Sequence, residues 1–145
     1  MSNYLNTNVL LENYKNLYRS KYFIDKSLII DSLNQLLNTS DKYVCITRPR
    51  RFGKSSIASM IGAYYSKAVK SKEIFDNLKI SSSESYIENL NKYNVISISF
   101  NEIPDNMKSY DDYINMIRTQ LIRDITEKYT YIKADKYFNI SSMLM

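Results

Sequence analysis

The stretch RPRRFGKSS, Arg48–Ser56, decides the expected fold because of the segments on either side of it. A short apolar run, YVCIT at Tyr43–Thr47, comes before it, and apolar residues at helical spacing follow from Lys54 to about Lys67. The order strand, loop, helix is that of a phosphate-binding loop, in which backbone N–H groups and a helix N-terminus face a phosphate chain. This order predicts an α/β fold with a parallel sheet flanked by helices, rich in helix.

Three residues of the stretch match the chemical roles of such a loop. Gly53 provides the turn, the Lys54 ammonium reaches the β/γ-phosphates, and the Ser55 hydroxyl ligates Mg²⁺. The predicted site for ATP or GTP with Mg²⁺ consists of these three and Arg48, Pro49, Arg50, Arg51, Phe52 and Ser56. The full pattern G-x-x-x-x-G-K-S/T asks for a glycine where this sequence has Arg48, so the match is incomplete.

The alternative interpretation of Arg48–Ser56 is a basic turn whose arginines contact solvent or nucleic-acid phosphates. Phe52 argues against it, because an aromatic side chain at this place suits a loop folded back on its own strand and helix.

The stretch resembles the loop of the AAA-ATPase-like P-loop proteins, which reads R-P-R-R-F-G-K-S/T and also lacks the first glycine. Those proteins carry Y-F-V/I-D-K-S/T upstream, and this chain has YFIDKS at Tyr22–Ser27. They also carry F-x-x-L-x-I, here Phe75–Ile80, and a strand ending in S-F, here Ser99–Phe100. The resemblance covers about Tyr22–Ile103 and implies a truncated P-loop NTPase-like parallel sheet.

The resemblance also implies function. It places Tyr22, Phe23 and Asp25 on the base side of a bound nucleotide, although the two aromatic residues suit core positions equally well. Family members continue into a Walker B strand with a catalytic carboxylate and usually a nuclease-like half, whereas this chain stops at Met145. The resemblance therefore implies one truncated domain over residues 1–145 that binds nucleotide and hydrolyses it slowly or not at all when alone.

The catalytic residues stay unassigned at this stage. The chain has no histidine, which excludes Ser-His and Cys-His catalysis and zinc sites that need histidine. Glu102 and Asp105 are the remaining candidates for acid chemistry, because they follow the second expected strand, Val95–Phe100. The resemblance places that strand before the catalytic one, which argues against both.

Composition limits the class of protein. With 145 residues and 44% hydrophobic content, the chain is the size of one ordinary domain. Its net charge of +5 favours polyanionic partners such as nucleotide or nucleic acid. Cys45 is the single cysteine and is expected to be a small buried apolar residue in a reducing compartment. No apolar run approaches the ~20 residues that cross a bilayer, so we expect a cytoplasmic protein with no membrane contact.

Apolar spacing predicts several helices. A short surface helix is expected at Asn8–Tyr18, with Asn8 as its cap. The others are expected at Leu28–Asn38, Lys54–Lys67 and Tyr110–Tyr129, with a helical turn at Tyr86–Leu90 and a polar loop at Ser81–Ser85.

Two hypotheses about partners remain open. The first is an anti-defence protein of a phage or mobile element, of the anti-CRISPR type, which inhibits an RNA-guided nuclease or another nucleoprotein and uses the loop only as scaffold. Small size, basic charge and a composition typical of AT-rich coding sequence fit this hypothesis. The second is self-association or an obligate protein partner. It rests on the unpaired edges that a shortened sheet would expose and on an apolar tail at Ile140, Met143, Leu144 and Met145.

Overall fold

The computed structural model describes residues 3–100, 104 and 107–132 of the chain. The chain divides into two compact units, one formed by Asn8–Val95 and the other by Met1–Thr7 together with Ile96–Met145. The Arg48–Ser56 stretch and all the residues that surround it belong to Asn8–Val95.

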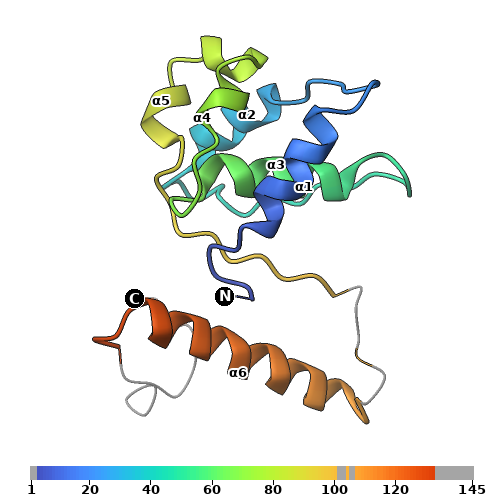
Figure 1. Ribbon diagram of the computed structural model, residues 1–145, viewed down its shortest axis with the longest axis vertical. Coiled ribbons are helices and arrows are strands. Elements are labelled where there is room, and N and C mark those ends of the chain that lie inside the picture. Colours follow the sequence, from blue (N-terminus) through green and yellow to red (C-terminus); the bar gives the residue numbers. More distant parts are fainter. Residues whose placement is uncertain (1–2, 101–103, 105–106, 133–145) are drawn as a thin grey trace. The chain divides into compact units, whose positions relative to one another are not determined.

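Helices build the Asn8–Val95 unit (Figure 1). They are α1 (Val9–Tyr18), α2 (Leu28–Leu36), α3 (Lys54–Tyr65), α4 (Lys72–Phe75), the 3₁₀ helix η1 (Lys79–Ser82) and α5 (Tyr86–Asn89). The three longer helices and the α5 turn confirm the predictions from apolar spacing. Helix α4 was not predicted and η1 replaces the start of the expected polar loop, because single turns are too short to show a period. Asn8 precedes α1 but makes no side-chain capping hydrogen bond.

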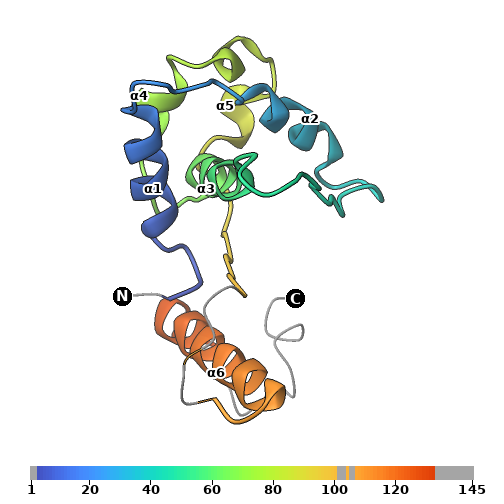
Figure 2. The same ribbon diagram turned by 90° about the vertical axis from the view of Figure 1, so that its right-hand side faces the viewer.

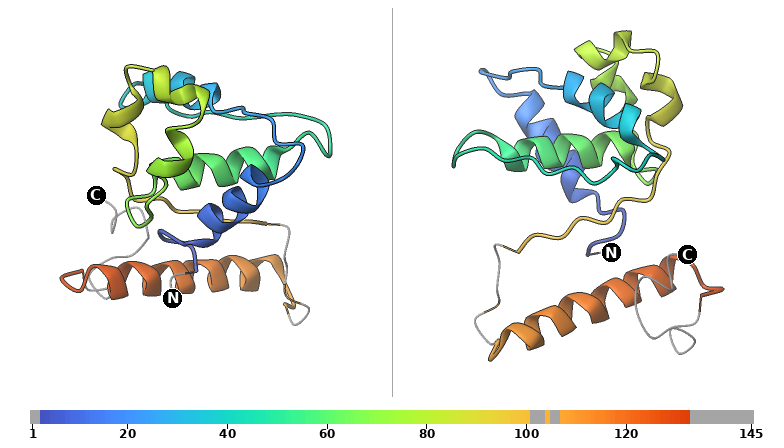
Figure 3. Two further views of the ribbon diagram at one scale, coloured as in Figure 1. Left: turned by 45° about the horizontal axis from the view of Figure 1, so that its top comes forward. Right: turned by 180° about the vertical axis from the view of Figure 1, so that it is seen from behind.

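Aromatic rings form the part of the core of this unit where α1, α3 and α4 meet. Helix α1 was expected to lie on the surface, yet its Tyr14 is 1% exposed and its ring stacks on Phe75 with the centroids 5.4 Å apart. Tyr64 of α3 meets Phe75 edge-on at 5.3 Å. Helices α1 and α3 pack directly against each other (Figure 3). A Cβ on Gly62 would lie 3.1 Å from Cβ and Cγ of Leu10. Gly62 therefore permits the close approach that buries Tyr14.

A buried polar network joins α2 to α3. The side-chain amide of Asn34 donates to Tyr64 Oη at 3.2 Å and to Ser85 Oγ at 2.9 Å. Its carbonyl oxygen accepts from Tyr65 Oη at 2.7 Å, and Tyr64 Oη donates to the Tyr86 carbonyl at 2.7 Å. Because these polar atoms satisfy one another, the network orients α2 without the cost of an unpaired buried group.

The predicted parallel sheet is wrong. Within the described residues there is no β-strand, and extended pairing is limited to isolated bridges, Ser66 with Tyr93 and Leu5 with Ile96. The expected strand Tyr43–Thr47 is an irregular segment that runs beside α3 and turns back to enter it (Figure 3). Tyr43 is 87% exposed. Alternating apolar residues favour an extended chain, but a strand also needs a partner that completes its hydrogen-bond ladder.

The second expected strand, Val95–Phe100, does not pair with the first, and its backbone contacts the N-terminal residues. The Ser97 N–H donates to the Tyr4 carbonyl at 3.0 Å, which places this segment beside the N-terminal residues.

Cys45 is exposed instead of buried, because no neighbouring strand covers it. The prediction of self-association through open sheet edges loses its basis together with the sheet.

In the other unit, α6 (Tyr110–Lys128) is one uninterrupted helix and confirms the prediction for this segment (Figure 2). The Ser109 side chain caps it by accepting from the Asp112 N–H at 3.1 Å. Asp124 of α6 accepts hydrogen bonds from the backbone N–H groups of residues 3–5 at 3.1, 2.6 and 3.1 Å. No helix of the described residues is long and apolar enough to cross a membrane. The apolar tail, Ile140 to Met145, lies outside the described residues.

Candidate functional site

Two residues of the loop before α3 have a left-handed backbone conformation, and Phe52 separates them. Arg51 has a φ of 66° and Gly53 a φ of 78°. Gly53 is the N-cap of α3, and its carbonyl accepts the first helical hydrogen bond from the Ile57 N–H at 2.9 Å. No side chain of the described residues caps this end of the helix. The first turn of α3 therefore offers backbone N–H groups and the positive end of the helix dipole to an anion.

Lys54 folds back over the loop. Its Nζ donates to the carbonyl oxygens of Arg48 at 2.5 Å and Pro49 at 2.9 Å. These bonds tie the segment that approaches the loop to the start of α3. They use two of the three N–H bonds of the ammonium group, and the third has no acceptor among the described residues. Lys54 thus holds the loop closed and keeps a charged donor at its surface.

Positive charge gathers around this turn. Arg48, Arg50, Arg51 and Lys54 are exposed, and none of them pairs with a carboxylate among the residues that the structure describes. A fifth cation comes from a distant part of the sequence, since Lys26 Nζ lies 3.5 Å from the Phe52 carbonyl oxygen. An uncompensated cluster of this kind attracts polyanions.

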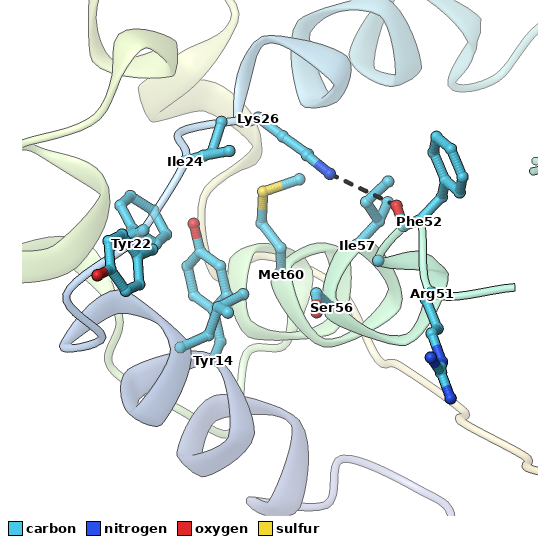
Figure 4. A pocket seen from close by; sticks show the side chains of 12 residues that line it. Tyr14, Tyr22, Ile24, Lys26, Arg51, Phe52, Ser56, Ile57 and Met60 are labelled. Atoms are coloured by element: carbon cyan, nitrogen blue, oxygen red, sulfur yellow. Dashed lines mark hydrogen bonds between the residues drawn. The ribbon is translucent and has the colours of Figure 1, made fainter.

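A pocket of about 340 Å³ opens beside the loop (Figure 4). Its volume falls in the range of about 300–1,000 Å³ that is typical of small-molecule sites. It is lined by Tyr14, Leu17, Tyr22, Phe23, Ile24, Lys26, Arg51, Phe52, Gly53, Ser56, Ile57 and Met60. The loop contributes the polar edge of the pocket, and α1, α3 and the segment before α2 contribute its apolar and aromatic walls.

The structure brings only some of the predicted site residues to the pocket. Arg51, Phe52, Gly53 and Ser56 line it. The other members of the predicted set lie outside it, on the loop (Arg48, Pro49 and Arg50) and in the first turn of α3 (Lys54 and Ser55). Phe52 is 59% exposed, so it borders the pocket and is not packed tightly against the chain as expected. The site therefore has two parts, a basic loop and an apolar pocket, which meet at Gly53 and Ser56.

Tyr14 is the most buried polar side chain of the pocket. It is 1% exposed, and its hydroxyl has no hydrogen-bond partner among the described residues. Figure 4 shows this hydroxyl pointing toward Ile24. Burial raises the pKa of Tyr14, and the nearby Asp25 raises it further. The hydroxyl therefore stays protonated at neutral pH and remains a hydrogen-bond donor.

The residues that the resemblance placed beside the base divide into two groups. Tyr22 and Phe23 both line the pocket, and Tyr22 is 83% exposed, so it is not a core residue. Phe23 also packs edge-on against Tyr14, with the ring centroids 6.3 Å apart. Asp25 does not line the pocket, because its carboxylate accepts from the N–H groups of Ser27 at 2.8 Å and Lys79 at 2.7 Å. It holds the Tyr22–Lys26 segment in place.

Sequence reasoning missed several members of the site. Tyr14, Ile57 and Met60 lie within predicted helices and Lys26 lies within the YFIDKS motif, and no local signal shows that they share a pocket. Glu102 and Asp105, the candidates for acid chemistry, lie outside the described residues. Among the residues that are described, no group of three or more acidic, histidine or cysteine side chains could hold a metal ion directly.

Comparison with known protein families agrees with the resemblance to the AAA-ATPase-like proteins. Residues 9–144 match the family described as "Predicted AAA-ATPase". The match spans most of the chain, so the protein belongs to this AAA-ATPase-like family. Comparisons with curated proteins and with solved structures gave no match.

Proposed function

We propose that this protein binds a purine nucleoside triphosphate with Mg²⁺. The phosphates lie on the Arg48–Ser56 loop and the base occupies the adjoining pocket. The observation that carries the proposal is the meeting of three features at Gly53: an uncapped helix N-terminus, a cluster of unpaired cations and an apolar pocket of about 340 Å³. Membership of the AAA-ATPase-like family supports the same conclusion.

The loop supplies the groups that a phosphate chain needs. Backbone N–H groups of the first turn of α3 donate to phosphate oxygens, and Lys54 exchanges its carbonyl acceptors for the more negative phosphate oxygens. The Ser55 hydroxyl stands in this first turn and would ligate Mg²⁺ together with the nucleotide. Because no cluster of acidic ligands is found in the described residues, the nucleotide itself brings most of the ligands of the metal.

The pocket supplies a surface for the base. Tyr22 and Phe23 offer aromatic faces, while Ile57 and Met60 of α3 offer apolar contact. Neither the Arg48–Ser56 stretch nor the pocket lining contains an acidic residue, so the described part of the site has no carboxylate that would orient a water molecule as a base. The proposal is therefore binding of nucleotide, with hydrolysis by the isolated chain slow or absent.

Isothermal titration calorimetry with ATP and Mg²⁺ tests the proposal. Wild type is expected to bind, and Lys54→Ala is expected to weaken binding by at least about tenfold, because a charge-assisted hydrogen bond contributes about 1.5–3 kcal/mol. Lys70→Ala removes an equal charge at an exposed position outside the pocket and serves as the matched control. Failure of wild type to bind would overturn the proposal.

The same pair of variants examines the hypothesis of an inhibitor that uses the loop only as scaffold. Such an inhibitor would keep its activity in Lys54→Ala. No residue contact in the described structure favours that hypothesis over nucleotide binding, and it stays a prediction.

A further inference from the structure

A second cavity of the Asn8–Val95 unit shares no lining residue with the pocket beside the loop. It measures about 270 Å³, and most of its lining side chains are apolar. They come from α2, α3 and the segment between these helices: Leu33, Leu36, Leu37, Lys42, Val44, Ile46, Ile61 and Tyr65. The volume is below the range of about 300–1,000 Å³ typical of small-molecule sites, so the cavity suits the apolar side chains of a polypeptide better.

The segment Lys42–Thr47 follows this cavity with the side-chain alternation of a strand. It contains no turn or bend. Val44 and Ile46 line the cavity. Tyr43 and Cys45 do not line it and are exposed. A period of two is that of an extended chain, whose successive side chains point to opposite faces.

The backbone of the same segment is unpaired. No described residue accepts from the N–H groups of residues 42–47 or donates to their carbonyl oxygens. A row of such groups on an extended, exposed chain is a template for pairing with another strand. In recognition by strand addition, main-chain hydrogen bonds give affinity, and a cavity beside the edge receives alternate side chains. Both elements are present here.

Charge at one end of the segment determines which partner fits. Arg48, Arg50 and Arg51 follow it directly, and none of them pairs with a carboxylate in the part of the chain that the structure describes. At the other end, Lys42 follows Asp41, so that end is close to neutral. A strand with carboxylates beside the three arginines is therefore electrostatically complementary.

A second copy of this chain fits less well. Antiparallel pairing of two copies centred on Cys45 would place Arg48 of one opposite Lys42 of the other. Parallel pairing in register would place each arginine beside its own copy. Like charges directly opposite each other destabilise a strand pair.

We propose that Lys42–Thr47 accepts a β-strand of another protein, with an apolar side chain at every second position and acidic residues beside the arginines. The incoming strand pairs with the free N–H and carbonyl groups, and its apolar side chains enter the cavity against Leu36 and Ile61. The inference goes beyond the proposed function and does not depend on it, because the two cavities are lined by different residues.

Two labelled peptides of alternating valine and threonine test the proposal by fluorescence polarisation with the full chain, without nucleotide. Glutamates at the amino end suit antiparallel pairing, and glutamates at the carboxyl end suit parallel pairing. One peptide should bind, and lysines in place of its glutamates should weaken binding by at least about tenfold. Failure of both peptides to bind at up to about 1 mM, or equal binding of the lysine version, would overturn the proposal.

N-methylation of the peptide that binds separates strand pairing from side-chain contact. Successive N–H groups of a strand point to opposite edges, so methyl groups on alternate amides block one edge and leave the other free. Of the two isomers made in this way, one should bind at least about tenfold more weakly and the other as the unmodified peptide does. Equal affinities of the two isomers would contradict strand pairing.

Two variants of the protein locate the peptide. Val44→Asn places a polar side chain at the cavity and should weaken binding by about three- to tenfold. Thr47→Asn changes an exposed residue that does not line the cavity and should bind as wild type does. A thermal melt of each variant shows whether it is folded. Wild-type affinity in a folded Val44→Asn protein would place the peptide elsewhere and refute the proposed surface.

Analytical ultracentrifugation of wild type distinguishes the proposed partner from a second copy. Under reducing conditions, the protein should sediment as a monomer without peptide. A dimer that the peptide dissociates would identify a second copy as the occupant of the segment and would overturn the choice of an acidic partner.

Discussion

Replacing Gly53 by alanine tests the left-handed turn that opens α3. Gly53 has φ 78° and ψ 26°, a conformation that costs a residue with a side chain about 1–2 kcal/mol. A Cβ at this position would lie 3.3 Å from Lys26 Nζ and 4.0 Å from Ser56 Cβ. The first contact is tight, but the end of a lysine side chain moves at little cost, so backbone strain is the larger effect.

Alanine also restricts the unfolded chain, which offsets about 0.4–1 kcal/mol of that strain. We therefore expect Gly53→Ala to lower the free energy of unfolding by about 1 kcal/mol, which is about 2–4 °C in the melting temperature of a chain of this size. The affinity for ATP should fall as well, because the N–H groups after Gly53 would be turned away from the phosphates.

Urea unfolding followed by circular dichroism measures the difference. Gly53→Asn is the matched control, because asparagine adopts the left-handed conformation more readily than alanine and should lose less stability. A Gly53→Ala protein as stable as wild type would show that the loop does not need a left-handed residue here. The geometry proposed for the phosphates would then be wrong.

Two further predictions concern carboxylates that accept hydrogen bonds from backbone N–H groups. Burial alone would raise the pKa of Asp25, but hydrogen bonds from the N–H groups of Lys79 and Ser27 outweigh it and lower the pKa. Asp25 should therefore stabilise the fold fully above the unfolded carboxyl pKa of about 3.9 and lose this contribution as the pH falls through its lower folded pKa. In urea unfolding, the difference in stability between wild type and Asp25→Asn should shrink in acid. A difference that does not depend on pH would contradict this role of Asp25. Asp124→Asn should lower the free energy of unfolding by about 1.5–3 kcal/mol in thermal melts, because its new amide group would face the N–H donors of residues 3–5; an unchanged melt would refute that role.

The helices and the loop could be predicted because their signals are local. Apolar residues three and four apart place α1, α2, α3 and α6 within a few residues of their observed bounds. Gly53 can adopt the left-handed conformation found before α3. The basic character of the loop is equally a property of neighbouring residues. These features need no knowledge of what packs against them.

The absence of a sheet from the described residues could not be predicted, because strand pairing is not local. Tyr43–Thr47 and Val95–Phe100 both alternate or cluster apolar residues, which favours extended chain in each. Whether such a segment becomes a strand depends on a partner, and the partner is chosen by the tertiary structure. Here the second segment pairs with the N-terminal residues through Leu5 and Ile96.

The sequence alone determined that Gly53 stands where a helix begins and that the residues around it are basic. Only the tertiary structure decided that Tyr14, some forty residues upstream of Ser56, lies in the same pocket with its hydroxyl unpaired. The physical reason is that helical periodicity determines which face of α1 is apolar, whereas the burial of a polar atom depends on every segment packed around it. The close approach at Gly62 and the stacking on Phe75 bury this hydroxyl, and neither can be read from the residues next to Tyr14.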